Sequence, residues 1–91
     1  MLFKAKILTI YHPRIGCTVG ELREHIARQF LPGMTWDNHG IYTRTNINVW
    51  HIDHIIPCYK FDLVKKADRL VCFNYKNLRP WWAIDNFSKI R

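Results

Sequence analysis

The sequence predicts one small domain of the α+β class. Its 91 residues are enough for a single domain, which we place over residues 1–91. Strand-like and helix-like segments alternate along the chain, and no repeat or linker separates them. A chain of this length buries only about 60–65% of its unfolded surface, so the core should be thin. Four Trp, four Tyr and five Phe should supply much of its buried area.

Residues 1–33 should form a strand followed by a helix. Phe3–Tyr11 is rich in Ile, Leu and Phe, which favours a short strand. Thr18 and Glu21 have the spacing of a capping box, in which each side chain binds a free backbone N–H of the first helical turn. Apolar residues then recur at helical spacing, which predicts an amphipathic helix over Val19–Phe30.

Residues 49–91 should form a core of two strands and a closing helix. Val49–Ile56 alternates and is rich in β-formers, so it is the first predicted strand. Phe73–Leu78 is predicted as the second strand, which Pro80 should stop. Proline is tolerated in the first turn of a helix, so Trp81–Lys89 is the predicted closing helix. The two remaining segments, Met34–Asn48 and Cys58–Val71, should be irregular. The second should contain one helical turn near Val64–Arg69.

Charge and cysteine content narrow the class of partner and the compartment. The formal net charge of +7 and the pI of about 9.7 favour a polyanion such as DNA, RNA or an anionic membrane surface. We expect no membrane span and no signal peptide, because lysines interrupt the N-terminal apolar stretch. The three cysteines form no Cys-x-x-Cys pair, so we expect reduced thiols, no structural zinc and an intracellular location.

The densest polar group lies within the first of these two strands. His51, Asp53 and His54 occur among apolar neighbours that would hold them rigid, as a metal ligand or a catalytic base requires. Neighbouring residues of a regular strand point to opposite faces. Asp53 and His54 can therefore address one phosphate only if the strand twists, bulges or ends there.

A second polar group lies at the end of the chain. If the closing helix includes Trp82, then Trp82, Asn86 and Lys89 share one helix face at i, i+4 and i+7. This spacing would set an amide oxygen for a hard cation beside an ammonium group for a phosphate. An ordinary polar helix face is the alternative interpretation.

Together the two groups resemble the HNH endonuclease family of ββα-metal nucleases. The resemblance runs from about Met34 to Lys89. Within this family, the chain is similar to HNH proteins of phages and large viruses. It implies that Asp53 and Asn86 are metal ligands and that His54 is the general base. It also implies that Asn77 braces the loop between the strands. The resemblance thus implies an H-N-N variant with a ββα-metal core.

The resemblance further implies one Mg²⁺ or Mn²⁺ ion, because carboxylate and amide oxygens suit hard cations. The implied activity is metal-dependent cleavage of double-stranded DNA by a one-metal mechanism, with nicking and weak sequence preference. Basic and polar residues are assigned to DNA contact: His51, Arg79, Lys89, Arg91 and Arg44. For His51, metal coordination or orientation of the site is also open.

Other interpretations remain open. A non-catalytic nucleic-acid-binding module would carry the same charge, although binding alone does not require Asp53, His54 and Asn86 together. A structural accessory subunit, or an enzyme that needs a partner such as phage packaging proteins, is a further alternative. A homodimer would explain double-strand breaks. The expected location is the cytoplasm or the interior of a host cell.

Overall fold

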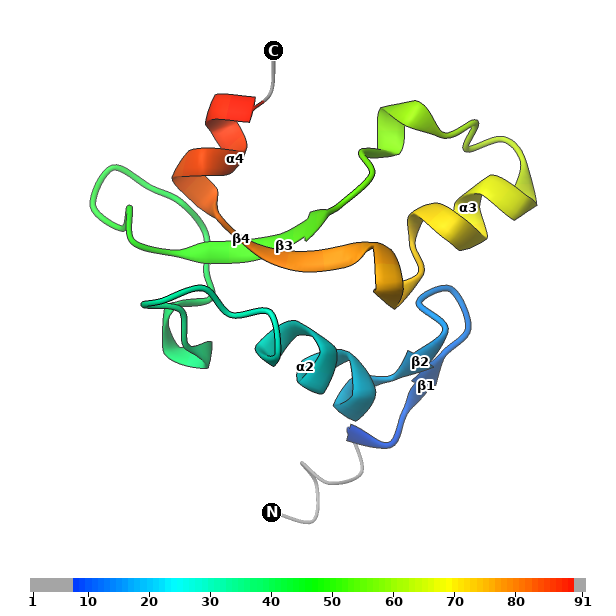
Figure 1. Ribbon diagram of the computed structural model, residues 1–91, viewed down its shortest axis with the longest axis horizontal. Coiled ribbons are helices and arrows are strands. Elements are labelled where there is room, and N and C mark those ends of the chain that lie inside the picture. The colour runs from blue at the N-terminus through cyan, green and yellow to red at the C-terminus, as the bar shows by residue number, and fades with distance from the viewer. Residues whose placement is uncertain (1–7, 90–91) are drawn as a thin grey trace.

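The computed structural model describes residues 8–89, with side chains through residue 86, and its class is α+β, as predicted. Two small antiparallel sheets and three helices make up the described fold (Figure 1). The strand pairs are β1 (Tyr11–His12) with β2 (Cys17–Thr18), and β3 (Trp50–His54) with β4 (Leu78–Trp82). The α-helices are α2 (Val19–Ala27), α3 (Lys66–Cys72) and α4 (Ala83–Lys89), and 3-10 turns cover Trp36–Asn38, Cys58–Lys60 and Tyr75–Asn77.

The N-terminal helix begins where the capping box predicts. The Thr18 side chain accepts from the Glu21 backbone N–H, and the Glu21 carboxylate accepts from the Thr18 N–H. The predicted strand over Phe3–Tyr11 falls partly outside the described residues. Its described part is wrong except at Tyr11, because strand pairing is confined to the short β1. Apolar composition alone does not establish a strand, and residues 9–11 are exposed in the structure.

The second strand of the main pair lies further along the chain than predicted. Phe73–Leu78 is mostly a helical turn, and β4 runs over Leu78–Trp82. Pro80 therefore lies inside the strand instead of ending it. A two-stranded sheet leaves each strand with a free edge, where a proline without an N–H is accommodated. Because Trp82 belongs to β4, the predicted helix face that it shares with Asn86 and Lys89 does not form.

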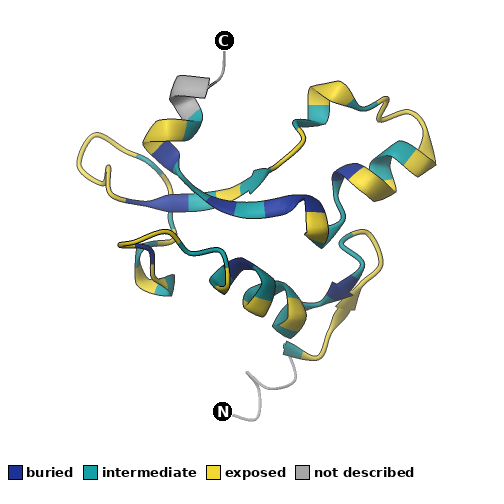
Figure 2. Ribbon diagram, viewed as in Figure 1, coloured by how far each residue is buried: buried dark blue, intermediate teal, exposed yellow. Residues whose placement is uncertain are grey.

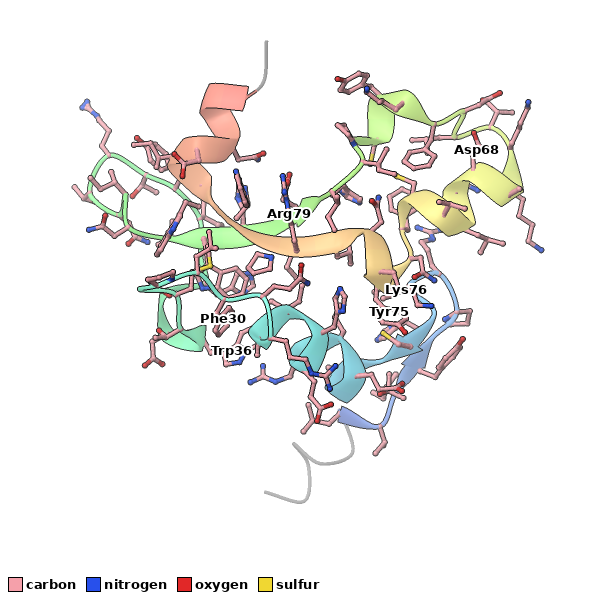
Figure 3. All side chains as sticks on the ribbon, viewed as in Figure 1. Phe30, Trp36, Asp68, Tyr75, Lys76 and Arg79 are labelled. Carbon is pink, nitrogen blue, oxygen red and sulfur yellow. The ribbon has the colours of Figure 1, made fainter. Side chains whose placement is uncertain are left out.

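The register of β3 and β4 divides their side chains between two faces. Directly opposed residues share a face, and alternate residues switch faces. Pairs Trp50–Trp82, Ile52–Pro80 and His54–Leu78 belong to the inner face, which packs against α2. Pairs His51–Trp81 and Asp53–Arg79 belong to the opposite side, called the outer face below. In Figure 3 the labelled Arg79 lies on the side of the strands away from α2.

The core lies between the inner face and α2, where burial concentrates in Figure 2. Trp50 is fully buried and contacts the rings of Phe30 and Trp36 edge-on, at centroid distances of 5.2 and 5.3 Å. Its indole N–H donates to the Thr35 carbonyl over 2.6 Å. This aromatic cluster holds the β3–β4 pair against α2 and so fixes the orientation of the outer face.

The connection between β3 and β4 contains more helix than predicted. The single turn expected near Val64–Arg69 is a two-turn helix, α3, displaced to Lys66–Cys72. The Arg69 guanidinium donates to the Leu63 and Val64 carbonyls, over 2.9 and 2.8 Å, and ties the preceding loop to α3. Within residues 8–89, no helix has the length and apolar character needed to cross a membrane.

Candidate functional site

The outer face brings together polar side chains from β3, β4 and α4. His51 and Asp53 alternate along β3, so both project from this face. α4 follows β4 without a loop, and this places Asn86 beside His51, with 2.9 Å between Asn86 Nδ2 and His51 Nε2. Residues 35 positions apart thus form one contact. His51, Asp53 and Asn86 therefore occupy the same side of the strand pair.

Asp53 forms an ion pair with Arg79 across the two strands. Arg79 Nε lies 3.2 Å from Asp53 Oδ2, and only 10% of the Asp53 side chain is exposed. The Arg79 guanidinium also stacks over the Trp81 ring at 3.9 Å. The sequence predicted Arg79 as a phosphate contact, and its nearest anion in the structure is Asp53.

The donor set of the outer face fits a hard divalent cation. Asp53 offers carboxylate oxygens, and Asn86 offers an amide oxygen. When His51 Nε2 accepts a hydrogen bond from Asn86 Nδ2, the Asn86 amide oxygen is left for a cation. A cation at Asp53 would share the carboxylate with Arg79 or displace it. The Asp53 and Asn86 ligands implied by the family resemblance are chemically compatible with Mg²⁺ or Mn²⁺.

A further histidine adjoins this group. His39 stacks on the Trp50 ring with 4.3 Å between centroids. Burial, and to a lesser extent the nearby His51, lower the pKa of His39. His39 is therefore held neutral at neutral pH, and it adds no positive charge to the neighbourhood of His51.

His54 belongs to a different environment from Asp53. The register stays regular through His54, so the strand does not bulge between these two residues. His54 meets the edge of the Phe73 ring at 5.8 Å, beside Cys58 and Cys72. Because β3 ends at His54, a phosphate at that end of the strand is the geometry in which both side chains could contact it.

Two cysteines lie next to His54, a grouping that the sequence analysis missed. The Cys72 thiol donates to the Cys58 sulfur across 3.0 Å, and both thiols are free. Burial, with a contribution from Cys58, raises the pKa of Cys72 to about 11. Cys58 follows His54 by four residues, a ligand-like spacing visible in the sequence, but Cys72 joins them only through the fold.

Asn77 is the one buried polar residue in the described part of the chain. Its side chain donates to the carbonyls of Ile56 and Cys72, over 3.1 and 2.9 Å, and accepts from the Ile56 N–H over 2.8 Å. These three hydrogen bonds tie both ends of the connection between the strands to the start of β4. The role that the resemblance implies for Asn77, bracing of the loop between the strands, is compatible with these contacts and stays a prediction.

The remaining basic residues are not gathered at the outer face by any described contact. Arg44 is exposed on the loop before β3, in a turn closed by Thr43 and Asn46. Lys89 lies in α4, beyond the last described side chain, and Arg91 lies outside the described residues. Their predicted role in DNA contact stays a prediction.

Comparison with known proteins finds viral relatives. No protein-family model matches the chain, and no solved structure matches it. One uncharacterized protein of Acanthamoeba polyphaga mimivirus is 40% identical over 75 residues, which cover 82% of this chain and 30% of that protein. A second uncharacterized mimivirus protein is 36% identical over 66 residues, covering 72% of this chain and 26% of its own length. The chain thus spans less than a third of these relatives, and the similarity supports the viral origin expected from the sequence.

Proposed function

We propose that the chain is a metal-dependent DNA endonuclease domain with a ββα-metal core formed by β3, β4 and α4. One observation carries the proposal: Asp53 and His51 project from one face of a strand pair that a helix directly follows, and Asn86 of that helix contacts His51. A hard cation and a phosphodiester would both be accepted there. The formal net charge of +7 favours a nucleic acid as the substrate.

Asp53 and Asn86 would hold the cation. When bound, a divalent ion offsets the charge of the phosphate and stabilises the leaving 3′ oxygen. His51 orients the amide of Asn86 through their 2.9 Å contact. Arg79 restrains the Asp53 carboxylate and can direct its terminal nitrogens to a phosphate oxygen. The ion pair thus positions the ligand and adds a positive charge beside the substrate.

His54 is the proposed general base. A neutral imidazole nitrogen takes a proton from water, and the resulting hydroxide attacks phosphorus. The P–O3′ bond breaks, the leaving 3′ oxygen takes a proton from a water molecule, and the products are a 5′-phosphate and a 3′-hydroxyl. His54 can serve a site centred on Asp53 only at the end of β3, so the scissile phosphate should lie there. One site cuts one strand, so nicking is expected of a monomer and double-strand breaks only of a homodimer.

The test is a supercoiled-plasmid assay with Mg²⁺, Mn²⁺ or EDTA. Wild type should nick only with metal, and His54→Ala should lose at least about 100-fold in rate, since a general base contributes about 10²–10⁴-fold. His12→Ala is the matched control, because His12 is exposed in β1. Asn86→Ala should raise the metal concentration required. Equal nicking by wild type, His54→Ala and Asn86→Ala would refute the proposal.

Two other outcomes are informative. If His51→Ala abolishes cleavage and His54→Ala does not, the base is the histidine on the outer face, and the nuclease assignment stands. If the chain retards DNA but does not cut it in the presence of any of the metals tested, the chain is a binding module. The Asp53–Arg79 ion pair favours that second candidate, because it neutralises the carboxylate without any metal.

A further inference from the structure

Three side chains of metal-ligating types meet where β3 ends, from segments that the Asn77 hydrogen bonds tie together. His54 is the last residue of β3, Cys58 begins the following 3-10 turn, and Cys72 ends α3. Their ligand atoms all lie within 4.8 Å of one another. In residues 8–86, no other three His, Cys, Asp or Glu side chains come this close. We propose that His54, Cys58 and Cys72 bind one soft divalent cation such as Zn²⁺, at a site separate from Asp53 and Asn86.

The ligand chemistry selects the ion. Thiolate and imidazole ligands favour Zn²⁺ and related ions over Mg²⁺, which prefers oxygen. Two Zn–S bonds of about 2.3 Å at a tetrahedral angle separate their sulfur atoms by about 3.8 Å. The two sulfur atoms are 3.0 Å apart in the structure, so binding requires them to separate by less than one ångström. Three protein ligands leave a fourth position for water.

The surrounding contacts hold the ligands in place. Cys72 is fully buried, whereas His54 and Cys58 are half-buried and give an ion access from solvent. Asn77 donates to the backbone carbonyls of Ile56 and Cys72, and so fixes the chain before one cysteine and at the other. A ligand set restrained in this way needs little rearrangement to bind.

Binding balances charge and protons at the site. Each thiol gives up one proton when it coordinates, so one divalent ion replaces two protons and the total charge is unchanged. A neutral complex avoids the cost of an isolated charge beside a buried cysteine. The neutral imidazole of His54 gives its lone pair to the ion and releases no proton.

A consequence for cleavage rests on the proposed nuclease function. A metal-bound His54 nitrogen cannot accept a proton from water, so Zn²⁺ at this site should inhibit cleavage that Mg²⁺ supports. The binding itself is independent of that function. Failure of the nuclease proposal would leave metal binding intact, and failure of metal binding would leave Mg²⁺-dependent nicking intact.

The test is titration of the 91-residue chain with Co²⁺ in a phosphine reductant, followed by Zn²⁺ competition. A 1:1 complex should show a sulfur-to-cobalt charge-transfer band with the intensity of two thiolates, and Zn²⁺ should abolish it. Cys58→Ser, at a half-buried position, should halve the band and weaken binding at least about 100-fold, because loss of a partner outside the ligand shell already costs about 10–100-fold. Cys17→Ser is the matched control, because Cys17 lies in β2.

Thermal unfolding of each apo variant establishes that it is folded, and His54→Ala gives a second ligand substitution that spares both thiols. The proposal is overturned if the protein shows no charge-transfer band although a thiol reagent detects all three cysteines in the reduced form. It is also overturned if Cys58→Ser and His54→Ala bind Co²⁺ as tightly as wild type. Loss of binding in both, with binding kept in Cys17→Ser, supports it.

Discussion

Replacing Asn77 with alanine should cost about 3 kcal/mol of folding stability. The substitution removes three hydrogen bonds and leaves the Ile56 N–H and the carbonyls of Ile56 and Cys72 without a partner. A lost hydrogen bond costs about 1 kcal/mol on average, and more where the abandoned group stays buried, as at Cys72. A chain of this size has a total stability of about 5–14 kcal/mol, so the loss is a large fraction of it.

Urea unfolding followed by tryptophan fluorescence measures this loss, and the melting temperature should fall by about 12–24 °C. Asn74→Ala is the matched control, because Asn74 is also an asparagine of this connection but makes one exposed bond, to the Lys76 N–H. It should cost about 1 kcal/mol or less. Asn77→Asp should be at least as damaging as Asn77→Ala, since it presents a carboxylate to two carbonyl oxygens. A loss below about 1 kcal/mol for Asn77→Ala would refute the bracing role.

Three further predictions concern Trp50 in the core, the pKa of His39, and Gly16 in the turn between β1 and β2. Trp50→Ala should cost about 3–5 kcal/mol by urea unfolding, because Trp50 is fully buried and also donates to Thr35, whereas Trp50→Phe should cost less. The lowered pKa of His39 means that the folded state binds fewer protons than the unfolded state, so unfolding free energy should fall as pH drops below about 6.5. His39→Phe should flatten that pH dependence, and an unchanged slope would contradict this cause. Gly16→Ala should cost at least about 1 kcal/mol in the same assay, because Gly16 has a φ of +82° and a Cβ there would lie 2.7 Å from a side-chain amide nitrogen.

The sequence by itself predicted the elements that depend on local chemistry. The capping box at Thr18 and Glu21 and the helical spacing after it placed the start of α2 correctly. The alternation around His51 placed β3. The order of strand, connection, strand and helix from residue 49 onward also followed from the sequence, because propensity and periodicity act over a few neighbouring residues.

The bounds of a strand that depend on pairing with another strand were decided by the tertiary structure. The start of β4 is set by pairing with β3, which draws Pro80 and Trp82 into the strand despite the local preference for a break and a helix. The separation of Asp53 from His54 follows from the regular register of that pair. A sequence pattern states that neighbours alternate, but only the packed strand shows that no bulge intervenes.

Contacts between residues far apart in the sequence could likewise not be predicted from the sequence. His51 meets Asn86 because α4 follows β4 directly and rises on the side of the strands away from α2 (Figure 1). Cys72 joins His54 and Cys58 because the Asn77 side chain ties the end of α3 to the chain that follows β3. The sequence determined which ligand types the chain carries. The tertiary structure decided that Asp53 and Asn86 lie on one side of β3 and that Cys58 and Cys72 gather at its end. Only three-dimensional packing brings side chains many residues apart within a few ångströms.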